Sequence, residues 1–286
     1  MSLQAGASPE FDRPIFIVST PRSGSTLLFE ALEQARDLFS TGRESHQLIE
    51  RIPGLHPSER NWESNRLERS DATPERVAAL RKSFAEQLRD REGSSAAGTV
   101  RMLEKTPKNA VRVPFLDAAF PDSIFVYLYR DPRETLGSMI EAWLSGAFRT
   151  YPQLPGWTGY PWSLLLVPGW RALIGKALPD IVAAQWATTT ELLVHDLSQL
   201  PRERLVCATY AELVADPQRT LERLAAALDL GWDRRLEPRL PPSKTALTRP
   251  APGKWRRWEQ AIEAVFPTIR EADSAARKLL GALPEA

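Results

Sequence analysis

The stretch PIFIVSTPRSGSTLLFEALEQA, residues 14–35, decides the fold class of this chain. Its first seven residues, 14–20, are mostly apolar and rich in β-branched side chains, which predicts a short buried strand. The apolar side chains of residues 27–35 recur at helical spacing, and the six residues between the two segments predict a tight turn. A strand that passes through a tight turn into a helix is the repeating unit of parallel α/β sheets.

The rest of the chain continues the alternation of strands and helices. Apolar runs predict buried parallel strands at residues 100–104, 123–129 and 205–208. Helical patterns occupy residues 75–91, 108–120, 131–143, 180–200 and 217–230. We therefore expect an α/β fold with a mainly parallel sheet flanked by helices, in which residues 1–12 are a disordered lead and residues 13–286 form a single domain.

Two segments interrupt this alternation. Residues 53–74 are polar and irregular, which predicts a surface excursion. Residues 148–170 hold six aromatic side chains together with prolines and glycines, and no periodicity fits them. Loops of this length usually bind something or cover a site, so we expect this one to form the wall of a small-molecule pocket; covering the sheet is the alternative. Trp62 and Trp186 are candidates for stacking on a base or for packing in the core.

Composition and charge exclude several classes of protein. The 286 residues include 37 Lys and Arg against 36 Asp and Glu, a net charge of +1, whereas nucleic-acid-binding domains carry a concentrated basic excess. No apolar run approaches the ~18 residues of a membrane span, and no signal-peptide pattern is present. The single cysteine, Cys207, lies in an apolar run and has no internal disulfide partner, which favours a cytoplasmic location.

The turn between the first strand and helix has the features of an anion site. Backbone N–H groups and the helix dipole at such a turn favour an anion, and a glycine allows it to approach the backbone closely. The residues that would bind it are Arg22, Ser23, Gly24, Ser25 and Thr26. The alternative is a tight turn capped by serine.

The turn does not match the nucleoside triphosphate pattern. That pattern requires a second glycine followed by lysine, and the turn has neither. The strand at residues 123–129 ends in Arg130 before any carboxylate that could hold magnesium. We therefore expect an oxyanion site without a metal.

Two motifs together resemble the sulfotransferases that use 3′-phosphoadenosine 5′-phosphosulfate (PAPS). STPRSGSTLL, residues 19–28, resembles the loop that binds the 5′-phosphosulfate in that family. FVYLYRDPRETLGSM, residues 125–139, resembles the second motif, in which Arg130 and Ser138 match the residues that hold the 3′-phosphate. The resemblance implies a single-domain sulfotransferase fold with a P-loop-like parallel sheet, PAPS as donor and PAP (3′-phosphoadenosine 5′-phosphate) as product.

Further matches follow along the chain. Residues 206–217 resemble the family segment whose tyrosine contacts adenine, here Tyr210. Residues 104–107, EKTP, resemble a segment of the carbohydrate- and tyrosylprotein-type enzymes and make Lys105 the candidate for the bridging oxygen of the donor. Residues 243–255 resemble the C-terminal loop that closes over the nucleotide, which adds Lys254 to the expected cofactor contacts. Only seven of the basic residues are lysines, so both lysines are informative.

The base that accepts the proton of the acceptor is expected in the segment GRESH, residues 42–46. Its resemblance to the tyrosylprotein enzymes assigns the base to Glu44, whereas the ordinary pKa of histidine, about 6.5, favours His46. Two departures set the chain apart from the cytosolic phenol and steroid enzymes: Arg22 replaces a loop lysine, and their Ser-His-Leu-Pro segment is absent. The chain therefore resembles the branch with arginine in the loop.

The sequence thus predicts transfer of a sulfuryl group from PAPS to a hydroxyl of an apolar small molecule or a carrier-bound chain, without a metal. The rival hypotheses are a metal-dependent nucleotide kinase or NTPase and a non-catalytic nucleotide-binding protein. The identity of the acceptor and the oligomeric state stay open at this point.

Overall fold

The computed structural model describes residues 9–247 and 251–281. Most of the expected disordered lead, residues 1–8, lies outside this part of the chain, but its end is ordered. Glu10–Phe11 forms strand β1, which pairs in parallel with β4, Thr99–Lys105. The expectation of disorder is therefore wrong at these two residues, because the Phe11 side chain is 7% exposed and packs edge-on against the ring of Phe120.

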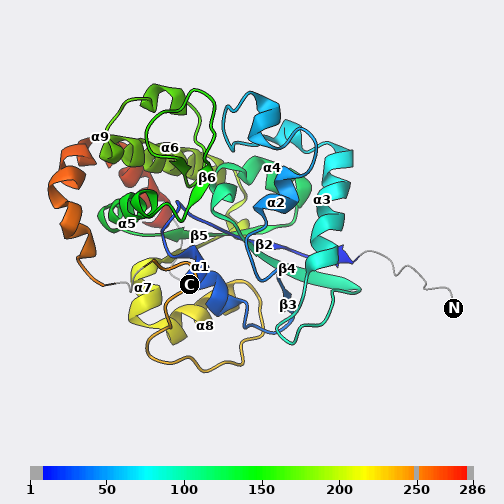
Figure 1. Ribbon diagram of the computed structural model, residues 1–286. Helices are drawn as coiled ribbons and strands as arrows, with labels where there is room; N and C mark the ends of the chain where they lie inside the picture. The colour runs from blue at the N-terminus through cyan, green and yellow to red at the C-terminus, as the bar shows by residue number, and fades with distance from the viewer. Residues whose placement is uncertain (1–8, 248–250, 282–286) are drawn as a thin grey trace.

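A parallel sheet in the order β1-β4-β2-β5-β8 forms the centre of the molecule (Figure 1). β3, Leu38–Phe39, pairs with β4 off this path, also in parallel. The other bounds are Ile15–Val18 for β2, Ile124–Tyr129 for β5 and Leu205–Thr209 for β8. The expected α/β class with a mainly parallel sheet is confirmed.

Alternation along β2 assigns the two faces of the sheet. Ile15 and Ile17 point to one face, which is covered by helices α1, Ser25–Leu32, α7, Tyr210–Ala215, and α8, Pro217–Ala227. Phe16 and Val18 point to the opposite face. That face is covered by α3, Pro74–Gln87, α4, Val113–Ala119, and α6, Leu178–Ser198 (Figure 1).

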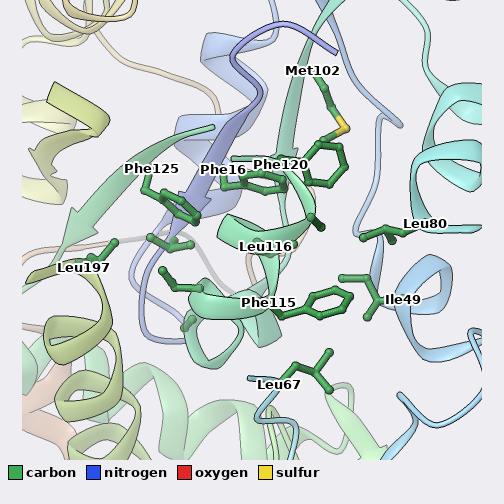
Figure 2. Close-up of a cluster of buried hydrophobic side chains, with 14 of the residues drawn as sticks. Phe16, Ile49, Leu67, Leu80, Met102, Phe115, Leu116, Phe120, Phe125 and Leu197 are labelled. Atoms are coloured by element: carbon green, nitrogen blue, oxygen red, sulfur yellow. The ribbon is translucent and has the colours of Figure 1, made fainter. Parts of the chain in front are cut away.

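Phenylalanine rings form the centre of the second face. Figure 2 shows Phe16, Phe120 and Phe125 gathered beneath Met102, with Leu116 of α4 beside them. The ring of Phe120 lies 5.6 Å from that of Phe16 and 6.2 Å from that of Phe84, measured between centroids, at the tilted and edge-on angles that aromatic pairs prefer. This cluster fixes α3 and α4 against the sheet.

A separate apolar cluster lies beside the sheet and is built on helices. It joins α5, Pro132–Ser145, and α6 to the C-terminal helix α9, Glu259–Gly281, which the sequence patterns did not predict. A short 3₁₀ helix, η6 at Lys254–Trp258, packs on α5 where Gly137 leaves room: a Cβ there would lie 2.9 Å from that of Trp255. None of the helices in the described ranges is long and apolar enough to cross a membrane.

Several element boundaries differ from the expected ones for identifiable reasons. Pro114 divides the expected helix at residues 108–120, because proline is tolerated only in a first turn. The chain forms a 3₁₀ helix, η3, over Pro107–Val111 and begins α4 at Val113, which places Pro114 in the first turn. The expected helix at residues 75–91 ends at Gln87, beyond which Arg89 bridges Ser40.

The two irregular segments contain more structure than expected. Residues 53–74 hold the 3₁₀ helices η1, Pro57–Arg60, and η2, Arg69–Asp71, and their Asn65 side chain is buried, with its Oδ1 accepting from the N–H of Leu166. Residues 148–170 contain a two-stranded antiparallel sheet, β6, Arg149–Tyr151, with β7, Trp162–Ser163. Two further 3₁₀ helices, η4 and η5, occupy Trp170–Leu173 and Arg202–Arg204.

We predict that Phe120→Ala lowers the free energy of unfolding by about 3–5 kcal/mol, since it removes a ring at the junction of three others. Urea denaturation of the variant and the wild type measures this difference. Leu144→Ala is the control, because Leu144 is 42% exposed and should shift stability by no more than about 0.5 kcal/mol. Equal effects of the two substitutions would contradict the assignment of this core.

Candidate active site

The carboxyl ends of four neighbouring strands meet at one edge of the sheet. β2 leads into the loop of residues 19–24, β4 ends at Lys105, β5 ends before Arg130, and β8 ends before Tyr210. The strands are adjacent in the order β4-β2-β5-β8, so parallel pairing alone brings these groups to one edge. Crevices outside the carboxyl ends of strands are where open α/β sheets bind ligands.

The loop after β2 holds the backbone in an unusual conformation. Gly24, the N-cap of α1, has φ of 97°, and Arg22 has φ of 70°. A Cβ on Gly24 would lie 2.4 Å from the ring of Tyr210, so glycine is needed both for the backbone angle and for this contact. The first N–H groups of α1, which have no partner inside the helix, belong to Ser25 and Thr26 at the cavity wall.

Ser23, unlike Ser25 and Thr26, does not lie at the cavity wall. Its side chain is fully buried, and its Oγ lies 2.6 Å from Oγ1 of Thr20. Its N–H donates to the carbonyl oxygen of Thr20 over 3.3 Å. In this structure Ser23 therefore shapes the loop from inside and does not line the cavity.

Arg22 connects the loop to three other segments. Its Nε donates to Oγ of Ser138 over 3.3 Å, and its Nη1 donates to the carbonyl oxygen of Thr245 over 3.2 Å. Its guanidinium also lies over the ring of Phe148, 4.4 Å from the centroid. Burial lowers the pKa of Arg22 and the nearby charge of Arg130 lowers it further, although arginine stays protonated at neutral pH.

Arg130 lies beside Arg22 with an unused donor. Its guanidinium stacks on Tyr210 at 4.3 Å from the ring centroid, and its Nη1 donates to the carbonyl oxygen of Arg22 over 3.1 Å. Its Nη2 is 3.4 Å from Oε2 of Glu134, while its buried Nε has no hydrogen-bond partner among the described residues. Two neighbouring guanidinium groups, one with an unused buried donor, make an anion the matching ligand.

Lys105 is a buried cation that joins the loop helix to the segment before α2, His46–Glu50. Its side chain is 3% exposed. Its Nζ donates to Oγ1 of Thr26 and to Oε1 of Glu44, each over 2.9 Å. Lys105 therefore does not form an ordinary surface salt bridge. It places a cation and a carboxylate beside the loop that follows β2.

His46 and Glu44 lie close together without a hydrogen bond. The distance from Nδ1 of His46 to Oε2 of Glu44 is 3.9 Å. Burial lowers the pKa of His46, and the charge of Lys108 lowers it further. Both effects favour the neutral form of the His46 imidazole.

A buried charged network in the cavity wall was not anticipated from the sequence. Nζ of Lys108 donates to both carboxylate oxygens of Glu50 and to the hydroxyl of Tyr151, each over 2.9 Å. Nη2 of Arg112 donates to the same Glu50 over 2.6 Å. Burial lowers the pKa of Lys108 to about 8. No local pattern in the sequence singled out this network of Lys108, Glu50 and Arg112.

The segment after α8 forms the far wall of the cavity. Oγ1 of Thr245 donates to Oγ1 of Thr26 over 3.1 Å, and the N–H of Gly253 donates to Glu134 over 2.9 Å. The ammonium group of Lys254 pairs with Glu141. Residues 248–250, part of the stretch expected to close over the nucleotide, lie outside the described residues.

These walls enclose a cavity of about 1230 Å³. Every sequence-predicted site residue lines it except Ser23 and Lys105, and Lys105 reaches it through Thr26 and Glu44. The lining members are Arg22, Gly24, Ser25, Thr26, Glu44, His46, Arg130, Ser138, Tyr210 and Lys254. Among the described residues, no group of three or more His, Cys, Asp or Glu side chains could hold a metal ion.

The aromatic segment contributes less to the cavity than expected. Phe148 and Tyr151 line it, whereas Trp157, Trp162 and Trp170 pack on one another at centroid distances of 4.8–6.0 Å. The expectation that this loop forms a binding wall therefore applies to residues 148–151 and to Leu164 and Leu165, because the three tryptophan rings cover the helices instead. Trp186 is 1% exposed in the core, and neither it nor Trp62 lines the cavity, so neither stacks on a base here.

Comparison with known proteins matches the sequence of this chain to a family. The model of the family described as Sulfotransferase family matches residues 14–234. The chain is 25% identical over 225 residues to Protein-tyrosine sulfotransferase A of Caenorhabditis elegans, covering 77% of this chain and 50% of that protein. It is 24% identical over 221 residues to Protein-tyrosine sulfotransferase of Drosophila melanogaster, covering 77% and 38%. The chain thus spans half or less of the length of these relatives.

Among solved structures, a sulfotransferase from Alicyclobacillus acidocaldarius superposes with a TM-score of 0.51 at 13% identity, covering 96% of each chain. At this identity the likeness bears on the fold alone. It agrees with the mainly parallel sheet and its flanking helices.

We predict that stability falls between about pH 7 and pH 5 partly because of His46. The unfolded chain binds a proton on His46 below about pH 6.5, whereas the folded chain, with its lowered pKa, resists that proton. Acidification therefore favours unfolding, and His46→Gln should lose less stability than the wild type over the same range. Urea denaturation at both pH values measures this, and equal losses would contradict the lowered pKa.

Proposed function

The chain belongs to the sulfotransferase family, and we propose that it transfers a sulfuryl group from PAPS to an acceptor hydroxyl by in-line displacement. One observation carries the proposal: Nζ of Lys105 bonds both Thr26 of the phosphate loop and Glu44, each over 2.9 Å. Lys105 thereby holds Thr26 of the loop that would bind the anion close to Glu44, the carboxylate that would accept the proton. We propose that residues 13–286 act as one domain.

The donor-binding residues that we propose fit a nucleotide with two separate phosphate groups. The 5′ end would bind at the N–H groups of Ser25 and Thr26 and at the guanidinium of Arg22, where the dipole of α1 adds favourable charge. The 3′-phosphate would bind Arg130 and Ser138, and the unused Nε of Arg130 supports this assignment. Tyr210, held by Gly24 and Arg130, offers a ring for the adenine.

The chemistry that we propose for the site is mostly positioning and electrostatics, as in phosphoryl transfer. PAPS, when bound, supplies an activated sulfuryl group with PAP as the leaving group. Lys105 and Arg22 place positive charge where negative charge grows on the leaving phosphate. Glu44 binds Lys105 through Oε1, which leaves Oε2 to accept the proton of the acceptor hydroxyl.

The acceptor that we propose is a hydroxyl on a fairly apolar small molecule or on a carrier-bound chain. Phe148, Leu164 and Leu165 line the cavity and support an apolar acceptor, while Glu50 and Lys108 add polar groups to its wall. The curated relatives bear the name protein-tyrosine sulfotransferase, so a tyrosyl peptide belongs in the same test panel.

We also propose a cytoplasmic location. Cys207 is a free thiol, and burial raises its pKa to about 12, so it is a poor nucleophile and suits a compartment in which thiols stay reduced.

We predict that PAP raises the melting temperature far more than ADP or ATP, with or without EDTA, because Arg130 and Ser138 provide for a 3′-phosphate. Arg130→Ala should remove most of this preference and weaken PAP binding by about 1.5–3 kcal/mol, the range for hydrogen bonds to charged groups. Arg133→Ala is the matched control, since Arg133 lies on α5, pairs with Glu263 and does not line the cavity. Equal stabilisation by ATP, or a magnesium requirement, would defeat the proposal.

We predict that Glu44→Gln lowers kcat by about 10²–10⁴-fold, the usual loss when a general base is removed. PAP binding should persist in this variant. His46→Gln should cost about tenfold or less, because the histidine touches neither the loop nor Lys105. Transfer of radiolabelled sulfuryl groups to a panel of alcohols, phenols and a tyrosyl peptide measures both rates. A dead His46 variant beside an active Glu44 variant would reverse the two roles.

A further inference from the structure

A second carboxylate beside the site has no part in the proposed chemistry. Glu104 directly precedes Lys105 on β4 and is 2% exposed. Its Oε1 accepts from Oγ of Ser45 over 2.5 Å and from Oγ1 of Thr106 over 2.6 Å. Its Oε2 accepts from Nδ2 of Asn109 over 2.6 Å. Burying a carboxylate this deeply costs free energy unless its oxygens are hydrogen-bonded, and both oxygens of Glu104 accept short hydrogen bonds.

Ser45, which donates to Glu104, separates the two candidate bases. It lies between Glu44 and His46 and precedes α2 as its N-cap. Its backbone N–H donates to Oγ1 of Thr106 over 2.7 Å, so both its side chain and its main chain are tied to the end of β4. Thr106 in turn donates to Glu104, which closes a ring of three groups.

Consecutive residues of β4 therefore hold consecutive residues of the segment before α2. Side chains alternate between the faces of a strand, so Glu104 and Lys105 point in opposite directions. Lys105 binds the carboxylate of Glu44, and Glu104 binds the hydroxyl of Ser45. Glu44, which is 35% exposed on its cavity side, is thus tied down both directly and through its neighbour.

We infer that Glu104 is a positioning residue, which orients Glu44 toward the acceptor by holding Ser45 and Thr106. The inference rests on the proposed function. Small displacements of a reacting group cost up to about 10²-fold in rate, so loss of this tether should lower kcat without weakening donor binding.

The test combines Ser45→Ala, Glu104→Gln and the double variant. Ser45→Ala is the mild variant, because it removes only the hydroxyl and keeps the main-chain bond to Thr106. Each single variant should lower kcat by about 10–100-fold, with the PAP-induced rise in melting temperature and the KM for PAPS close to wild type. The double variant should be no slower than the slower single variant, because the bond from Ser45 to Glu104 that Ser45→Ala removes is one of the three that Glu104→Gln disturbs.

The split between kcat and the KM for PAPS separates positioning from a merely structural role. A loosened Glu44 no longer faces the acceptor in its productive orientation, so kcat should fall in both single variants, while the bond from Lys105 to Thr26, which neither substitution removes, keeps the KM for PAPS close to the wild-type value. Asp117→Asn is the matched control: Asp117 is also a buried carboxylate, 7% exposed, but it pairs with Arg204 outside the cavity. It should lower the melting temperature and leave both kcat and the KM for PAPS unchanged.

Each outcome decides between the alternatives. Wild-type kcat in Ser45→Ala, a parallel loss of PAP binding in both single variants, or additive losses in the double variant would overturn the role of Glu104. If the wild type binds PAP but transfers nothing to any acceptor, the proposed function fails and this inference fails with it. An active wild type with unaffected variants would remove this inference alone.

Discussion

One buried ammonium group constrains the region around the cavity. Lys105, 3% exposed, bonds Thr26 on one side and Glu44 on the other. A charge at this depth is tolerated only when its partners stay in place, so the start of α1, the end of β4 and the segment before α2 have one favourable arrangement. The sheet positions the lysine, because β4 pairs with β2 and this pairing places Lys105 opposite Ile17. Ile17 lies three residues before Thr20, which belongs to the loop that follows β2.

The same geometry explains why positive charge gathers where it does. Parallel strands bring Arg130 and the loop of Arg22 to one edge, where each guanidinium raises the cost of burying the other. An anion bound between them, as proposed above, would relieve this repulsion and occupy the unused Nε of Arg130. Thr245 bonds to Thr26 of α1 and Gly253 bonds to Glu134 of α5, so this wall of the cavity is attached to both helices.

Features that depend on a continuous stretch of sequence could be predicted, whereas features that depend on contacts between distant segments could not. The turn around Gly24 and the strand before Arg130 are continuous stretches whose spacing indicates strand, turn and helix, so the sheet edge and the turn beside it were predictable. Whether a side chain lines a cavity depends on segments far along the chain. Ser23 turns inward to Thr20, Trp186 packs in the core, and Glu50 meets Lys108 from another element. Helix α9 was missed for the same reason, because its apolar face is explained only by its packing on α5 and α6.

A crystal structure of the protein with PAP tests the central claim most directly. The account predicts the 5′-phosphate at the N–H groups of Ser25 and Thr26, within hydrogen-bond distance of Nζ of Lys105. It also predicts the 3′-phosphate on Nε of Arg130 and Oγ of Ser138. A nucleotide bound in the reverse orientation, or one that leaves Nε of Arg130 without a partner and Lys105 out of reach of any phosphate, would contradict it.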